Sequence, residues 1–413
     1  MGLFRENERG STAIAVALSM TMVMGGAAFG VETSYWYYKD MQLQAAADAA
    51  AYAGALAKRE GGDLSDAEAA GTAVAISNGY NEAKGTAEFN SPPSTGSHTT
   101  SKAVEVILEE TSQRFFSAII TDTPVLLRAR AVATYEDAGS ACVLALHTSA
   151  SKAALFSGSS TSKFLGCSVM SNSLANDAVT VQGSGKVETS CIYSAGGVVA
   201  TAGMQLDDPA CPKPQIGVSP VGDPFGDLVA PEPSETCANA SGTTTGTKAT
   251  ALTTFEPGTY CSGLSLKDTV KLNPGVYVIE GGNFTVNAKA LVNAPGVTIY
   301  LKGTARVSMN GTATVKMSAP TEGTYSGVLF FSDRDNSDAT KNSYNGTADS
   351  LLTGAIYAAS QTISFNGNFS GDEGCTQIVG LIVEWNGNAN IKKDCKAYGM
   401  KSIPAAQLVK LVE

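Results

Sequence analysis

The chain opens with a long apolar segment near its N-terminus. No charged residue lies between Arg9 and Glu32. A helix needs about 20 apolar residues to cross the hydrocarbon core of a bilayer, so residues 11–31 predict a transmembrane helix. The aromatic run Tyr35–Tyr38 that follows suits a membrane–water interface. Because the tail of residues 1–10 contains two arginines, the positive-inside rule places it in the cytoplasm and the rest of the chain outside.

Two other interpretations of this segment stay open. Gly26-Ala27-Ala28 could be the cleavage site of a secretory signal, although such signals have a shorter apolar core. Prepilin-type processing could follow Gly10, although Ala15 stands where pilin-like precursors usually carry Glu. We therefore expect an uncleaved signal anchor.

The helix is expected to continue beyond the membrane. Leu43–Ala57 is dominated by Ala, the strongest helix former. The glycines at Gly61 and Gly62 end this helix, and either Asp63 or Ser65 can cap a second helix that runs to about Asn78. The small side chains either pack on the chain's own globular domain or let the helix of another protein approach closely, and the sequence leaves both open.

The second half of the chain consists of short apolar runs separated by Gly and Asn corners. Pro-Gly pairs recur at Pro257, Pro274 and Pro295. Further along, the pair Asn366-Gly367 is repeated at Asn386-Gly387. Regular repeats of this kind, with β-branched and aromatic residues between the corners, are typical of coils in a solenoid.

These repeats predict a right-handed parallel β-helix, with a β-sandwich as the alternative. The first coils would occupy residues 139–206 and the main β-helix residues 255–403. Residues 207–254 are rich in Pro, Gly and Thr and are expected to form a long surface excursion between the two parts. The tail of residues 404–413 is expected to cap the last coil and protect its edge.

The cysteines indicate an oxidising compartment. All eight lie at or after Cys142, on the side of the membrane where disulfides form. Their spacing matches one coil of a β-helix, and residues one coil apart stack about 5 Å apart, which a disulfide can span. The predicted pairs are Cys142–Cys167, Cys191–Cys211, Cys237–Cys261 and Cys375–Cys395.

Composition and motifs favour a protein without catalytic chemistry. The net charge of −10 offers no basic patch for nucleic acid. His98 and His147 are the only histidines, and no zinc-ligand spacing occurs. The strongest candidate for a calcium or sugar contact is the run from Asp333 to Asp338, which also suits a solvated loop between coils. We predict no catalytic residue, no cofactor and no metal site.

The N-terminal region resembles a known family. Glu8-Arg9-Gly10, the apolar run, the aromatic exit and the tract Leu43–Ala55 follow one another in the order typical of TadG-like proteins (TadE/TadG-like N-terminal region) of Tad/Flp pilus assembly. The resemblance implies that residues 32–138 form a helical stalk and a small pilin-like α+β unit. Many TadG-like proteins also carry a von Willebrand factor A domain, but His147 stands where its metal site needs a leading Asp.

The resemblance implies a membrane-anchored assembly or structural component of a Tad/Flp-type adhesive pilus. Its expected place is the bacterial inner membrane, with a single pass, a cytoplasmic N-terminus and the bulk of the chain in the periplasm. The expected partners are the Tad pilus machinery or pilin-like proteins, contacted through the Ala-rich helices. Two alternatives stay open: a β-helix that binds glycan or cell wall, and a carbohydrate-active β-helix enzyme.

Overall fold

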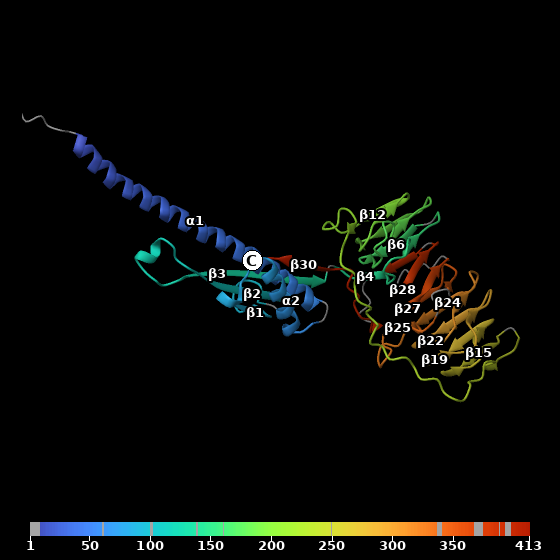
Figure 1. Cartoon of the computed structure of the whole chain (residues 1–413). Coiled ribbons are helices and arrows are strands. Elements are labelled where there is room, and N and C mark those ends of the chain that lie inside the picture. Colours follow the sequence, from blue (N-terminus) through green and yellow to red (C-terminus); the bar gives the residue numbers. More distant parts are fainter. Residues whose placement is uncertain are drawn as a thin grey trace, which may run out of the picture. The chain divides into compact units, whose positions relative to one another are not determined.

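The chain forms two compact units (Figure 1). The structure is a computed structural model that describes residues 9–59, 62–99, 102–137, 139–159, 161–248, 250–336, 341–366, 375–387, 389–392 and 398–413. The first unit contains Met1–Glu136 together with Leu408–Glu413, and the second contains Asp137–Gln407.

The first unit is an α+β fold, as predicted. Two helices lie on a four-stranded sheet with the order β1-β2-β3-β30. Its elements are α1 (Arg9–Arg59), α2 (Leu64–Ser77), the 3-10 turn η1 (Glu82–Lys84), β1 (Gly85–Asn90), β2 (Ala103–Ser112), the 3-10 turn η2 (Ser117–Ile119), β3 (Val125–Asp137) and β30 (Gln407–Leu411). Asp63 caps α2 as expected: its side chain accepts N–H bonds from Ser65 and Asp66.

The second unit is a β-solenoid of about 10 turns, which confirms the predicted β-helix class. Parallel strands stack in three columns, here called A, B and C. Column A consists of β16 (Gly258–Tyr260), β19 (Gly275–Ile279), β22 (Val297–Leu301), β25 (Val328–Ser332), β27 (Leu351–Phe365), β28 (Thr376–Trp385), β4 (Ala141–Ala145), β7 (Ser168–Ser171), β10 (Ile192–Ser194) and β13 (Gln215–Ile216).

The other two columns complete each coil. Column B consists of β17 (Leu264–Leu266), β20 (Phe284–Val286), β23 (Val307–Met309), β26 (Lys341–Tyr344), the later parts of β27 and β28, β5 (Ala154–Phe156), β8 (Val179–Val181) and β11 (Val198–Ala200). Column C consists of β15 (Leu252–Phe255), β18 (Thr269–Leu272), β21 (Leu291–Ala294), β24 (Thr314–Ser318), the start of β27, and a separate group of β29 (Ala389–Lys392), β6 (Thr161–Leu165), β9 (Lys186–Thr189) and β12 (Gly203–Leu206). A further strand, β14 (Thr243–Thr245), pairs antiparallel with β15.

The coils do not stack in the order of the chain. The chain enters the solenoid at β4, in the middle of column A, and builds outward through β7 and β10 to β13. It then passes through the rest of the excursion, after Ile216, to the opposite end of the stack and winds back from β15 and β16 to β28. There β28 pairs in parallel with β4 and β5, so Ile378 lies opposite Val143 and Val383 opposite Ala154. The two parts thus form one continuous stack.

A ladder of aromatic rings runs through the core across this joint. Phe365 stacks on Trp385 at a centroid distance of 4.3 Å, and Trp385 meets the edge of Phe164 at 5.4 Å. Phe164 belongs to the first part of the solenoid and Trp385 to the second. Each aromatic pair adds about 1 kcal/mol beyond simple burial, so the joint is packed like the interior of either part.

The Pro-Gly corners of successive coils lie close together without pairing glycine to glycine: Gly258, for example, pairs with Tyr277. The N–H of Gly275 donates to the carbonyl of Gly296 at 3.0 Å, while Gly275 pairs in the ladder with Val297. Gly275 has a φ of 142°, and a Cβ there would lie 2.4 Å from the ring of Pro257. A side chain at this corner would therefore collide with the coil below.

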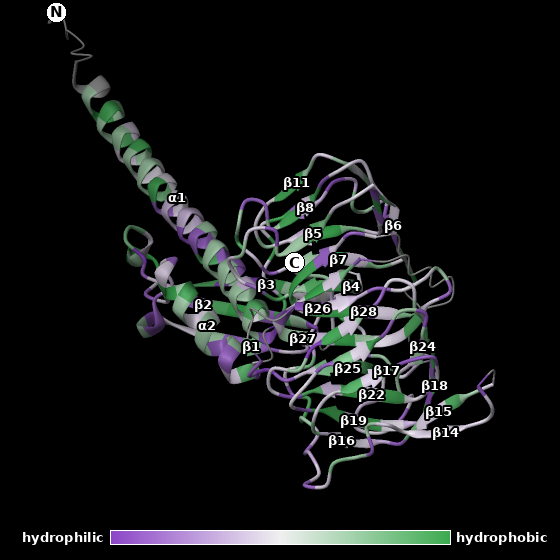
Figure 2. Ribbon diagram, turned by 90° about the vertical axis from the view of Figure 1, so that its right-hand side faces the viewer, coloured by the Kyte–Doolittle hydropathy of each residue, from purple (hydrophilic) through white to green (hydrophobic). Residues whose placement is uncertain are grey.

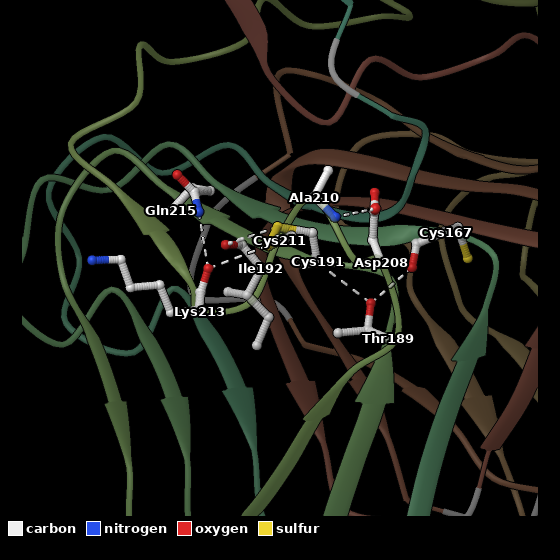
Figure 3. Close-up of a disulfide and its surroundings, with 9 residues drawn as sticks. All are labelled: Cys167, Thr189, Cys191, Ile192, Asp208, Ala210, Cys211, Lys213 and Gln215. Carbon is white, nitrogen blue, oxygen red and sulfur yellow. Dashed lines mark hydrogen bonds between the residues drawn. A yellow bond between two sulfur atoms is a disulfide. The ribbon is translucent and has the colours of Figure 1, made fainter.

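Three of the four predicted disulfides are present. Cys142–Cys167, Cys191–Cys211 and Cys237–Cys261 join neighbouring coils with Cα–Cα distances of 5.6, 5.7 and 5.6 Å. Figure 3 shows the second of these beside Thr189, whose hydroxyl donates to the carbonyl of Cys167 at 2.7 Å. Cys375 is also disulfide-bonded, and its predicted partner Cys395 lies outside the described residues.

The excursion is not a free surface loop, because it packs on the outer face of column A. Its side chains Val221 and Phe225 are buried there. Asn172 exchanges two hydrogen bonds with the backbone of Val221, at 2.7 and 2.8 Å. Further along, the guanidinium of Arg334 donates to the carbonyls of Phe225 and Leu228. The excursion is therefore held by residues from both parts of the solenoid.

The predicted cap at residues 404–413 is wrong. Ala405 and Ala406 pack on the outer face of column A, and the chain then leaves the solenoid. Gln407–Leu411 forms β30 beside β3 in the sheet of the first unit, where the N–H of Val132 donates to the carbonyl of Glu413 at 2.7 Å. An apolar tail can satisfy its backbone by completing a sheet as well as by covering a coil.

We expect the two parts of the solenoid to hold together without a covalent link. A protease site placed between Glu232 and Glu235, both exposed, would split the chain between the disulfides Cys191–Cys211 and Cys237–Cys261. The fragments should coelute in native size-exclusion chromatography, because β28 still pairs with β4 and β5, and β30 still pairs with β3. In denaturant, which breaks these pairings, the fragments should separate. Separation under native conditions would contradict the joint; the uncut protein is the control.

Glu413, which follows β30, should make the first unit sensitive to acid. Arg130 donates to the carboxylates of Glu105 and Glu413, and chiefly its bond to Glu413 lowers the pKa of that residue from 4.5 to about 2. The carboxylate thus stabilises the fold above its unfolded pKa, and this stability is lost as the pH falls toward 2. Glu413→Gln should flatten the fall in melting temperature of the first unit between about pH 5 and pH 3. Glu68→Gln, at an exposed position of α2, should leave that fall unchanged.

Candidate functional site

Helix α1 has two halves in different environments. From Ile14 to Val31 its large apolar side chains are exposed, and Figure 2 shows this half as mainly hydrophobic. Among the described residues, α1 is the one helix long and apolar enough to cross a membrane, by length and composition, and none of its most apolar window is buried. The second half of α1 lies in the core of the first unit.

The Ala-rich tract is that buried half. Its side chains at Leu43, Ala46, Ala47, Ala50, Ala51 and Ala55 are at most 3 % exposed and pack against α2 and the sheet. The small residues permit a close approach: a Cβ on Gly54 would lie 3.2 Å from the Val104 side chain and 3.3 Å from the carbonyl of Ala67. Of the two interpretations that the sequence left open, packing on the chain's own domain is confirmed for this face.

The opposite face of the same half is exposed. Tyr38, Met41, Ala45 and Tyr52 lie on it at helical spacing, and we call these four residues the outer stripe of α1. The outer stripe begins a few residues after the exposed apolar half of α1, which ends at Val31, and its side chains are exposed among the described residues of the first unit. It is the part of the Ala-rich helix that remains accessible to another protein.

Where its exposed apolar half ends, α1 is tied to the loop between β2 and β3. The carboxylate of Glu32 accepts the backbone N–H bonds of Phe115 at 2.6 Å and Ser117 at 2.8 Å. Arg114 lies over the ring of Trp36 at 5.3 Å. The local sequence does not predict this contact. Glu32 stands out only as the first charged residue after the apolar run.

The acidic run at Asp333 has a structural role. Asp333 accepts the N–H of Asp335 at 3.2 Å in a turn, while Arg334 holds the excursion and also donates to the hydroxyl of Tyr357 at 2.9 Å. Tyr357 in turn donates to Asp223 of the excursion at 2.6 Å. Residues 337–338 of the run lie outside the described residues.

The two histidines lie in different units of the chain. The Nδ1 atom of His147 accepts the N–H bonds of Ser149 and Ala150, which closes a local turn. His98 lies in a loop of the first unit, and His147 in the second. Within the described part of the chain, no three His, Cys, Asp or Glu side chains gather as metal ligands would.

Comparison with known proteins identifies the N-terminal region. Residues 10–57 match the family model described as putative Flp pilus-assembly TadE/G-like. This match confirms the resemblance drawn from the order of the apolar run, the aromatic exit and the Ala-rich tract. No curated protein and no solved structure matched the chain.

The two faces of α1 should respond differently to a larger side chain. Ala50→Leu puts a branched side chain into the packed core of the first unit and should destabilise it by about 1–3 kcal/mol in denaturant unfolding. Ala45→Leu adds the same side chain on the exposed outer stripe and should change stability by about 0.5 kcal/mol or less. Equal destabilisation by both variants would contradict the assignment of the faces.

Proposed function

Because residues 10–57 carry the TadE/G-like region of Flp pilus-assembly proteins, we propose that this chain is a membrane-anchored component of a Tad/Flp-type adhesive pilus. Its role is assembly or structure, without catalysis. The single observation that carries the proposal is α1, which joins an exposed apolar half to a half buried in a folded domain within one uninterrupted helix.

The proposed location is the inner membrane, with a cytoplasmic N-terminus and both units in the periplasm. Arginines precede the apolar run, and the first cysteine is Cys142. Three disulfides among the described residues support an oxidising compartment for the second unit. A chain crossing once at residues 11–31 accounts for both observations.

The proposed partner surface is the outer stripe of α1. A pilin-like protein anchored by its own helix would meet this stripe next to the membrane, where Ala45 leaves room for close packing. The inner face of α1 offers no such surface because the sheet and α2 cover it. The solenoid adds a rigid domain whose entry and exit lie together, since Ser140 bridges Pro404.

Replacing only the anchor tests the proposal. Residues 11–31 are exchanged for a cleavable export signal, which leaves the core residues after Leu43 in place. The product should be a soluble, folded periplasmic protein, because none of residues 13–31 is buried. The cells should lose pilus-dependent adhesion and surface pili.

A second strain provides the control. An unrelated single-pass helix in place of residues 11–31 restores anchoring. Because the outer stripe is unchanged in this strain, piliation should be restored. In this strain, Ala45→Arg should then reduce piliation without unfolding the protein, because it alters only the outer stripe. Normal piliation in the strain without any anchor would refute the proposed function.

A further inference from the structure

The loop that joins β2 to β3 exposes an unusual number of large apolar side chains. Phe115 and Phe116 are 54 % and 48 % exposed, and Ile119 and Ile120 are 93 % and 75 % exposed. Four such residues within six positions form a patch at one tip, and a contiguous apolar patch marks a contact with a partner or a membrane. We call residues 115–120 the apolar tip.

The position of the apolar tip along α1 is fixed. Glu32 is only 1 % exposed, because its carboxylate accepts the N–H groups of Phe115 and Ser117. The ring of Phe115 meets the edge of Tyr35 at a centroid distance of 5.3 Å. Arg114 closes the base of the loop by donating to the carbonyl of Thr123 at 2.6 Å.

This position coincides with the end of the apolar half of α1. The exposed apolar side chains of the helix run to Val31, and the loop is bound at the very next residue. In Figure 1 the β2–β3 loop extends beside α1 toward the N-terminal half of the helix. A bilayer core of about 30 Å that contains residues 11–31 therefore ends at the level of the apolar tip.

The chemistry around Glu32 also fits a membrane boundary. A carboxylate near hydrocarbon is costly unless its charge is hydrogen-bonded, and both oxygens of Glu32 have backbone N–H partners. Beside Phe115, a cleft of about 190 Å³ is lined by Lys39, Lys84 and Glu110 among others. Lys39 of this cleft lies one helical turn after Tyr35, close to the end of the apolar half of α1.

We propose that the apolar tip is a second membrane contact, which inserts into the periplasmic face of the bilayer that α1 spans. The inference rests on the proposed membrane anchor and adds to it. One helix alone leaves a domain free to rotate about the helix axis, whereas two contact points fix the face that the domain turns to the membrane. The outer stripe of α1 is then presented in one orientation.

Depth-dependent quenching tests this contact in the full-length protein. The described cysteines are all disulfide-bonded, so one added cysteine can be labelled with an environment-sensitive fluorophore after oxidative folding. Three single variants are compared: Ile119→Cys in the tip, Val23→Cys in the apolar half of α1, and Thr86→Cys at an exposed position of β1. The unsubstituted chain reports background labelling.

Each protein is reconstituted in vesicles of phosphatidylethanolamine and phosphatidylglycerol. The label at position 119 should be quenched by a lipid carrying a shallow nitroxide, and its quenching by aqueous iodide should be several-fold weaker than that at position 86. The label at position 23 should be quenched by a deep nitroxide.

The possible failures are distinguishable. If position 23 is quenched by lipid while iodide reaches positions 119 and 86 equally, the anchor stands and the tip does not touch the membrane. If position 119 is protected from iodide but not quenched by lipid, protein covers the tip and the proposal is overturned. If lipid does not quench position 23, the anchor and the inference both fail.

Discussion

The pairing of β28 with β4 and β5 is the contact on which the solenoid depends. Since the chain enters the stack in the middle, neither part of the solenoid is complete until these strands meet. The three described disulfides do not join the two parts of the solenoid, because each links neighbouring coils within one part. The joint rests on ladder hydrogen bonds, on the Phe164–Trp385 contact and on the excursion that Asn172 and Arg334 hold in place.

This order of coils links the two units through the chain. The solenoid is inserted between β3 and β30, so the sheet of the first unit is completed only by residues that follow the whole solenoid. The adjacent entry and exit at Ser140 and Pro404 make the insertion possible, because they return the chain close to where it left. Arg130 then links Glu105 of β2 to Glu413, which ties the last residues into the first unit.

Much of the fold could be predicted from local patterns. The long apolar helix, the cap at Asp63 and the three described disulfides each depend on a few neighbouring residues, which is why local patterns predicted them. The stacking order could not be predicted. The spacing of the repeats indicates the length of each coil, but it does not indicate which coils lie next to each other. The register could not be predicted either, because the recurring Pro-Gly pairs do not face one another: Gly275 pairs with Val297, and Gly258 pairs with Tyr277.

The candidate site was harder to predict because its contacts are long-range. The alanines of α1 fit equally well against the chain's own sheet and against another protein, and only the fold shows that the inner face is occupied. Glu32 is a single carboxylate with no neighbouring motif, and its partners Phe115 and Ser117 lie far along the chain, beyond both helices and two strands.

Together these contacts give α1 a defined orientation. The buried alanines fix which side of the helix faces the sheet, and Glu32 fixes the loop at the point where the apolar half ends. Because no break separates the two halves of α1, a rotation imposed on either half is transmitted to the other. The outer stripe is thereby held at a constant angle to the sheet of the first unit.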